Sequence, residues 1–470
     1  MKLTLLLLVS VILQGYSAAA DRLHSRSIRS AEPQPAAGAD PMRVAILNRV
    51  GYHNEVYTAL LQAFSLQGAD VTVFSDTNPV AALGIESVIR SWYTKPFRHY
   101  EELLPVVCDY SVLVFATWPE VHVPFAEQVV ARNCAGQQFL FTVHNPEELE
   151  TPANLAGLTL AAKVNAQFVA LAPHTTAATA AVLQRHNINQ PTALFVPIFN
   201  VDSAQSSAQE SAQGSDTVGA AVAADWDPTS AVAAADPRRN LMEQALTALA
   251  ALPAKGSQPR SRSLLQATDA SNPRAGSAAP RKGFAVQGLF QSHRRNYAQT
   301  FEEIAESPEL AGNPDFVLHV IGQGNVDVPA SLEHRIIIDT ALPYKEYYAS
   351  IRGCLAVLPA FASNMYYTKK ASSSVAAAVV CKTPLIADEQ LLKSYTYLTE
   401  ASVYLKTPGE TDAACMARVM KMSPEDIASR QAALDAVTQA IYADNAKVVA
   451  DVLQRAHHVH AVLNQAHHLH

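Results

Sequence analysis

The chain has 470 residues, of which 49% are apolar and 16% are charged, and its formal net charge is −7. This acidic balance excludes sequence-independent nucleic-acid binding as the main task, because such proteins carry a surplus of cations. The apolar fraction excludes a wholly disordered chain, and at roughly 100–200 residues per domain the length allows two or three cores. Five cysteines without a C-x-x-C pair indicate neither a disulfide-built scaffold nor a zinc site. Cys108 and Cys134 could pair if the compartment is oxidising.

The N-terminus has the layout of a secretory signal peptide. Residues 1–20, MKLTLLLLVSVILQGYSAAA, place Lys2 before an apolar run and end in small residues. The run is shorter than the roughly 20 residues that span a bilayer, so we expect no stable transmembrane span. We predict entry into the secretory pathway, with an ER, Golgi or extracellular destination. The next residues, DRLHSRSIRS, leave a plastid transit sequence as the alternative, and the chain has no N-x-[ST] sequon.

Composition divides the remainder of the chain. Residues 21–41 are rich in Ala, Pro and Ser and are predicted to be disordered, and residues 203–282 read as a low-complexity linker or insertion. Two blocks remain, 42–202 and 283–455, followed by a His-rich tail over 456–470. The tail has six histidines in its last fourteen residues but no carboxylate or thiolate partners. We therefore assign no metal site and expect a compositionally biased helical extension.

Both blocks alternate short apolar runs with helical stretches. The runs predicted as strands are 43–48, 70–74, 110–117, 138–143, 167–172 and 193–198, then 283–288, 316–322, 335–340, 353–359 and 383–388. Most are apolar on both faces, which is typical of buried parallel strands. We predict an α/β fold with two doubly wound Rossmann-like domains facing across a cleft. Ligands of such domains bind beyond the carboxyl ends of the strands.

One helix start has the composition of an anion site. In KKASSSVAAAVVC, Lys369 and Lys370 precede Ser372, Ser373 and Ser374, which open an apolar helix. Unpaired N–H groups at a helix start and nearby cations together favour a phosphate. The alternative is a Ser N-cap on a buried helix with two solvated lysines.

Several stretches resemble the GT-B glycosyltransferases, in particular the divergent eukaryotic family 1 and family 4-like proteins. They are FAVQGLFQSHRRNY (284–297), VLHVIGQGN (317–325), YYTKKASSSVAAAVVCKTPLIAD (366–388), RVAILNRVGYHNEV (43–56) and FLFTVHNP (139–146). The resemblance implies transfer of a sugar from a nucleotide-sugar donor to an acceptor that the sequence does not identify. It implies no cofactor beyond that co-substrate, and no metal, because cations and a helix dipole neutralise the leaving group.

The resemblance implies a donor site in the second block. Arg294 and Arg295 would meet the donor phosphates, since a guanidinium pairs with two phosphate oxygens; they could instead begin a surface helix and meet water. Gly288, Gly322 and Gly324 follow strands and would let backbone approach the ligand, although tight turns explain them equally well.

Aromatic residues flank the same proposed site. Tyr344 lies in the region that would hold the nucleotide base, with packing as the alternative, and Tyr366 and Tyr367 stand just before the phosphate-binding helix.

Two carboxylates of retaining members of the family are absent here. Alignment on Pro384 puts Lys369 and Ala377 where those members carry glutamates. Retaining chemistry of that type is therefore not expected, and Glu389 or Ser373 is the candidate for ribose recognition.

The first block supplies the candidate base. Gly51 would permit a sharp turn after the first strand, and His53 would then face the cleft as the general base of an inverting transfer. The alternative is a loop histidine bonded only to backbone. His144 and Asn145 follow another strand and are candidates for contact with the acceptor.

Two other classes of protein remain open. A non-catalytic nucleotide- or carbohydrate-binding protein on the same two lobes fits the absent glutamates. A bilobal receptor of the periplasmic kind fits the α/β pairs and the signal sequence, but it gives no reason for a KK-x-SSS helix start.

Overall fold

The structure is a computed structural model that describes residues 41–50, 53–75, 84–118, 122–201 and 282–467, with side chains as far as residue 462. The described residues all belong to one compact unit. The predicted signal peptide, Gly51 and nearly all of the predicted disordered stretches 21–41 and 203–282 lie outside the described residues.

The first sheet has seven parallel strands in the order β3-β2-β1-β4-β5-β6-β7. They are β1 (Arg43–Asn48), β2 (Asp70–Ser75), β3 (Arg98–His99), β4 (Val112–Phe115), β5 (Gln138–Val143), β6 (Ala166–Ala170) and β7 (Thr192–Leu194). Val44 and Ile46 of β1 pack in one core, while Ala45 and Leu47 pack in another on the opposite face. The central strands are buried on both sides, as their unbroken apolar runs predict.

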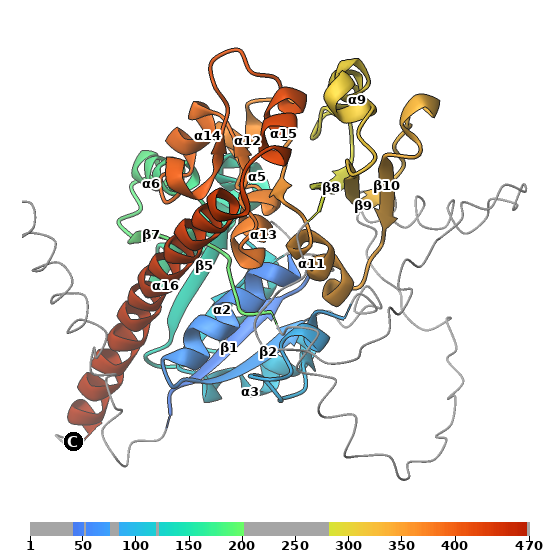
Figure 1. Cartoon of the computed structure of the whole chain (residues 1–470). Helices are drawn as coiled ribbons and strands as arrows, with labels where there is room; N and C mark the ends of the chain where they lie inside the picture. The colour runs from blue at the N-terminus through green and yellow to red at the C-terminus, as the bar shows by residue number, and fades with distance from the viewer. Residues whose placement is uncertain (1–40, 51–52, 76–83, 119–121, 202–281, 468–470) are drawn as a thin grey trace, which may run out of the picture. The chain divides into compact units, whose positions relative to one another are not determined.

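Helices cover both faces of this sheet (Figure 1). They are α2 (Asn54–Leu66), α3 (Leu103–Val106), α4 (Val123–Ala131), α5 (Pro152–Ala161) and α6 (Pro173–Arg185), with the 3₁₀ turns η2 (Ile85–Val88), η3 (Tyr100–Glu102), η4 (Val107–Asp109) and η6 (Pro146–Glu150). A disulfide joins Cys108 to Cys134. It closes a connection that runs through β4 and α4.

The second sheet has four parallel strands in the order β10-β9-β8-β11, namely β8 (Phe284–Phe290), β9 (Leu318–Gly324), β10 (Ile336–Thr340) and β11 (Ala356–Val357). A parallel bridge from Val357 to Leu385 connects β11 to the pair β12 (Ile386–Ala387) and β13 (Tyr404–Leu405). In both sheets the chain starts at a central strand, goes to one edge and then crosses to the other side. That reversal creates the switch point at which such sheets bind ligands.

The helices around the second sheet are α9 (Tyr297–Glu306), α10 (Pro308–Ala311), α11 (Tyr344–Arg352), α12 (Met365–Thr368), α13 (Ser373–Cys381), α14 (Glu389–Ser394) and α15 (Asp412–Met420), with η7 (Ala330–Leu332) and η8 (Glu400–Ser402). α13 is buried along almost its whole length, because its sequence SSVAAAVVC is apolar on every face. It packs beside β8 and β11, and its N-terminus lies at the carboxyl end of the sheet.

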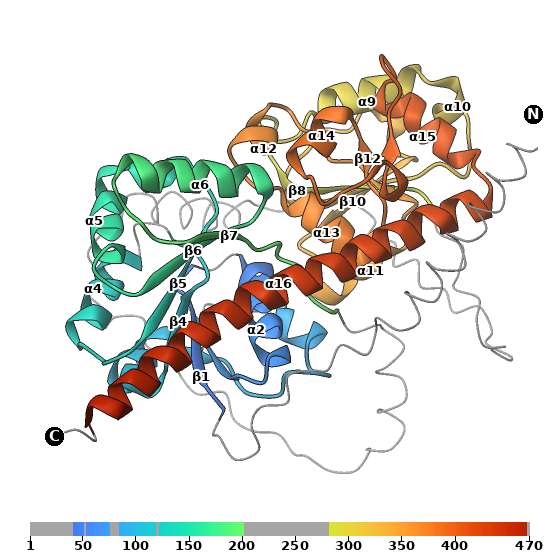
Figure 2. The same ribbon diagram turned by 90° about the vertical axis from the view of Figure 1, so that its left-hand side faces the viewer.

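The last helix, α16 (Pro424–His467), is 44 residues long and runs past both sheets (Figure 2). Asn445 is buried on it, and its side-chain amide bonds the backbone N and O of Val196 at 3.1 and 2.7 Å. The helical extension expected over the His-rich tail, 456–470, is present as far as His467, and α16 runs into it without a break at residue 456. No Gly or Pro follows Pro424 to end it.

The predicted α/β fold with two parallel sheets is confirmed. Some strands are shorter than their apolar runs: after β7, which ends at Leu194, the N–H of Val196 donates to Asn445 instead of to β6, and Pro197 has no N–H to donate. Among the described helices, none combines the length and the apolarity that crossing a bilayer requires.

Candidate functional site

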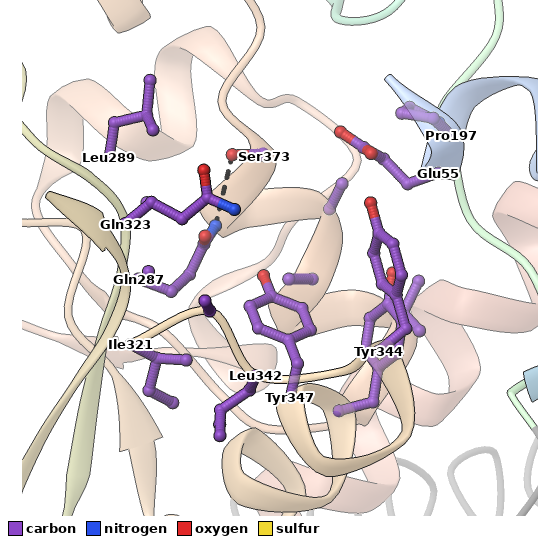
Figure 3. Close-up of a pocket in the computed structure, with 17 residues that line it drawn as sticks. Glu55, Pro197, Gln287, Leu289, Ile321, Gln323, Leu342, Tyr344, Tyr347 and Ser373 are labelled. Carbon is purple, nitrogen blue, oxygen red and sulfur yellow. Dashed lines mark hydrogen bonds between the residues drawn. The ribbon is translucent and has the colours of Figure 1, made fainter. Parts of the chain in front are cut away.

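A pocket of about 230 Å³ opens at the carboxyl ends of β8 and β9. Figure 3 shows Gln287, Gln323 and Ser373 on one side of it, the rings of Tyr344 and Tyr347 on another, and the carboxylate of Glu55 pointing in from α2. No Lys, Arg or His of the described residues lines it. The pocket therefore offers hydroxyls, amides, aromatic faces and one carboxylate, but no cation.

Two of the three serines at the start of α13 are buried, and their hydroxyls form hydrogen bonds within the protein. Ser372 is buried and caps the helix, its Oγ accepting from the Ser374 N–H at 3.2 Å. Ser374 is fully buried; its Oγ donates to the carbonyl of Gln287 at 3.2 Å and accepts from Arg295 at 2.8 Å. The prediction that all three hydroxyls face a ligand is therefore wrong for these two.

Ser373 is the exposed member of the triplet and lines the pocket. Its Oγ accepts from Nε2 of Gln287 at 3.3 Å, which leaves its own proton available for a ligand. The backbone N–H of Ser373 has no partner among the described residues, as expected for the first turn of a helix. One hydroxyl and one amide at this helix start thus remain for an anion.

Arg295 is a structural residue, contrary to its predicted phosphate contact. It is 3% exposed, and besides Ser374 it donates to the carbonyls of Gln287 and Arg294 at 3.2 and 3.1 Å. Its guanidinium also lies 4.9 Å from the ring centre of Tyr366. Burial lowers the pKa of Arg295. The alternative of a solvated surface residue is excluded as well.

The other predicted cations lie toward the first sheet. Lys369 pairs with Glu147 at 2.8 Å and Lys370 with Glu148 at 3.5 Å. These pairs are between a third and 60% exposed, so each stabilises the fold by about 1 kcal/mol or less. Arg294 is half-buried, and its Nε has no hydrogen-bond partner among the described residues.

The three predicted glycines have different roles. Gly288 and Gly322 line the pocket, so backbone does approach a ligand there. A Cβ at Gly322 would stand 1.7 Å from the carbonyl oxygen of Gly288, so β8 and β9 need a glycine at that position. Gly324 has a φ of +117°, which disfavours other residues.

The predicted aromatic and ribose contacts are only partly at the pocket. Tyr344 lines it, and burial raises its pKa well above the usual value, so the hydroxyl keeps its proton. Tyr366 is buried and does not line the pocket, and Tyr367 donates to Asp388 at 3.1 Å in a separate polar pocket. Glu389 is exposed at the start of α14 and pairs with Lys393, so the structure does not bring it to the pocket.

Two histidines stack at the carboxyl ends of β1 and β5. The His53 and His144 rings are 3.8 Å apart, with Nδ1 of His53 3.2 Å from Nε2 of His144. That Nε2 also lies 3.0 Å from the carbonyl of Ala116, which only accepts. Nε2 of His144 donates its proton to that carbonyl, and because an imidazole nitrogen carries one hydrogen, Nδ1 of His53 can only share it as a second acceptor.

Both rings are held neutral. Burial lowers the pKa of His53 well below its usual value, and the charges of His144, Lys370 and Arg294 lower it further. Burial lowers the pKa of His144 to about 4. His53 also has a φ of +64°, an unfavourable backbone conformation for a non-glycine residue, which is often found at functional sites.

The neighbouring Asn145 serves the fold. Its Oδ1 accepts from the Glu147 N–H at 3.2 Å and its Nδ2 donates to Glu148 at 3.0 Å, which caps η6. Both ends of this buried amide are thus occupied, and the predicted acceptor contact of Asn145 is not supported.

Sequence reasoning missed Glu55, Gln287 and Gln323. The signal for Glu55 was its position two residues after His53, at the start of the helix that follows β1. Gln287 and Gln323 lie within strands near their carboxyl ends, where a polar residue in an apolar run indicates a site.

No protein-family model matches the sequence, and no curated protein sequence matches it significantly. Among solved structures, the glycosyltransferase SnogD from Streptomyces nogalater is 14% identical, covers 88% of this chain and 100% of its own, and has a TM-score of 0.37. A UDP-forming trehalose-phosphate synthase from Burkholderia xenovorans is 11% identical over 89% and 99%, with a TM-score of 0.46. A putative UDP-N-acetylglucosamine 2-epimerase from Listeria monocytogenes is 12% identical over 84% and 92%, with a TM-score of 0.39. Because these likenesses are distant, we base the function on the residues of this chain.

Proposed function

We propose that the protein transfers a sugar from a nucleotide-sugar donor to the hydroxyl of an acceptor. The observation that carries the proposal is the separation of charge at the site. A pocket lined by tyrosines and amides, with no cation among the described residues of its lining, adjoins a helix start where Ser373 offers a hydroxyl proton and a backbone amide. The charges of Lys370 and Arg294 lower the pKa of His53, which supports a cationic environment near the histidine pair.

This separation matches the two halves of a nucleoside diphosphate. The nucleoside is uncharged and would occupy the pocket against Tyr344 and Tyr347, with its polar edges on Gln287 and Gln323. The diphosphate is anionic and would lie at the Ser373 amide, where the helix dipole and the charges of Lys370 and Arg294 favour it. The same groups would stabilise the diphosphate as it leaves.

The histidine pair would supply the base. A neutral imidazole can take the proton of an acceptor hydroxyl, and the lowered pKa values keep both rings neutral at physiological pH. Nε2 of His144 carries the proton that faces Ala116, so Nδ1 of the same ring is unprotonated. This nitrogen takes no part in the contacts with Ala116 and His53, and it can accept the proton of the acceptor hydroxyl. We therefore extend the predicted role of His53 to the pair His53–His144, acting in a direct, inverting displacement.

We also propose that the protein works in the secretory pathway. The Cys108–Cys134 disulfide supports this location, because such bonds persist in oxidising compartments.

Calorimetry with UDP and GDP tests the donor site. We expect the double variant Ser373→Ala, Lys370→Ala to bind the preferred nucleotide about 10- to 100-fold more weakly, since hydrogen bonds to charged groups contribute about 1.5–3 kcal/mol. Lys393→Ala is the matched control, because Lys393 is exposed and, in the described part of the chain, forms an ion pair with Glu389 alone. Absence of binding by the wild-type protein to any nucleotide refutes the proposal.

Turnover separates an enzyme from a binding protein. Release of nucleoside diphosphate from a nucleotide sugar should fall at least about 100-fold in His144→Ala and in His53→Ala, with nucleotide affinity retained. Full activity of both variants would remove the pair from the mechanism. Nucleotide binding without turnover in the wild type would instead favour the non-catalytic alternative.

A further inference from the structure

Glu55 is the acidic residue among the described residues that line the pocket. It belongs to the first half of the chain, which forms the first sheet, whereas the pocket lies at the carboxyl ends of strands of the second sheet. It lies in the first turn of α2, two residues after His53, whereas the tyrosines and glutamines of the pocket belong to the second half of the chain. Figure 3 shows its carboxylate directed away from α2, across the space above Tyr344. The pocket is thus closed by a carboxylate from α2.

This carboxylate has no salt bridge among the described residues. Its position at the helix start is favourable, because the N-terminal end of α2 attracts negative charge. Burial nevertheless raises the pKa of Glu55, which means that the carboxylate is poorly hydrated. A poorly hydrated carboxylate gains most from a ligand that donates hydrogen bonds to it.

The groups around Glu55 restrict what that ligand part can be. A phosphate would be repelled by the carboxylate and would find no cation in the lining. The lining also includes Ala376, Ala377 and Val380 of α13, which offer no hydrogen-bonding side chain. The carboxylate oxygens can instead accept two hydrogen bonds from adjacent hydroxyls, as a vicinal diol presents them.

We propose that Glu55 binds the ribose diol of the nucleotide, so that α2 of the first sheet completes a pocket built on the second. This inference rests on the proposed function, and it assigns to Glu55 the ribose contact that the sequence assigned to Glu389 or Ser373. Ser373 then remains for the diphosphate. The pocket is complete only when both halves of the chain contribute to it, which couples nucleotide binding to the arrangement that also holds the histidine pair.

Calorimetry on the full chain tests the assignment. The ligand is whichever of UDP, GDP and ADP binds most tightly, together with its 2′-deoxy and 3′-deoxy counterparts. In the wild type, loss of either hydroxyl should weaken binding about 10- to 100-fold. In Glu55→Ala the ribonucleotide should bind as weakly as the deoxy forms bind the wild type, and the three ligands should become equivalent. Glu55→Gln, which keeps one acceptor without the charge, should lie between the two.

Glu346→Gln is the control, since Glu346 is exposed in the first turn of α11 and does not line the pocket. It should discriminate between ribose and deoxyribose as the wild type does, and thermal melts verify that each variant is folded. Unchanged discrimination in both Glu55 variants overturns the assignment while the proposed function stands. If Glu55→Ala binds all three ligands more weakly by an equal factor, the assignment is also overturned, because the carboxylate then contacts a part of the nucleotide other than the ribose diol. Absence of nucleotide binding by the wild type overturns both proposals.

Discussion

His122 makes the protein sensitive to acid. It is fully buried at the start of α4, and its ring lies edge-on to Phe115 at 6.1 Å. Neither ring nitrogen has a hydrogen-bond partner among the described residues. Burial, together with the charge of Arg49, lowers the pKa of His122 to about 3. The folded protein therefore holds this ring neutral at a pH where the unfolded chain has already protonated it.

The size of the effect follows from linkage. The pKa in the unfolded chain is about 6.5, so the contribution of His122 to stability is fully present above that value and is lost as the pH falls toward 3. Each pH unit within this window costs about 1.4 kcal/mol. At pH 5 the wild type should have lost about 2 kcal/mol through this one group.

His122→Phe removes the titration and keeps a ring of similar shape. Urea unfolding of wild type and variant at pH 7.5 and pH 5, followed by circular dichroism, measures the loss between the two pH values. We expect the loss to be about 2 kcal/mol smaller in the variant, whatever the packing cost of the substitution. Phe125→Leu on the same helix is the control, and it should lower stability equally at both pH values. An equal loss in His122→Phe and wild type would refute the reasoning.

Three further variants test the assigned roles. Ser374→Ala should lower the free energy of unfolding by about 1–3 kcal/mol, because it leaves a buried donor of Arg295 unpaired, whereas Ser373→Ala should leave stability unchanged; equal unfolding midpoints for the two would contradict this. Arg295→Ala should cost about 3–5 kcal/mol or prevent folding, as expected for a buried network, and a soluble variant with wild-type stability would contradict the assignment. Replacing Cys108 and Cys134 by serine should cost about 3–4 kcal/mol, as loop-closure entropy indicates for a 26-residue separation, and unchanged thermal melts with and without reductant would disprove it.

Much of the fold could be predicted because it depends on local pattern. Largely apolar runs such as 138–143 are buried on both faces, and they became the central parallel strands. Short edge elements were missed, since β3 and β13 have two residues each and leave no period to detect. The continuation of α16 through the His-rich segment agrees with the helical extension expected there, since no Gly or Pro after Pro424 interrupts it.

The segments of the chain that form the site could be predicted from the sequence, but the directions of their side chains could not. The sequence by itself determined that a serine would cap α13 and that polar residues would follow the strands, because capping and strand ends are properties of neighbouring residues. Successive residues of a helix point about 100° apart, so only packing decided that Ser373 faces the pocket while Ser372 and Ser374 are buried. The stacking of His53 on His144, 91 residues away, and the approach of Glu55 to tyrosines nearly 300 residues later were decided by the tertiary structure. These contacts depend on how the two sheets and α16 pack together. No local sequence pattern encodes contacts between residues so far apart in the chain.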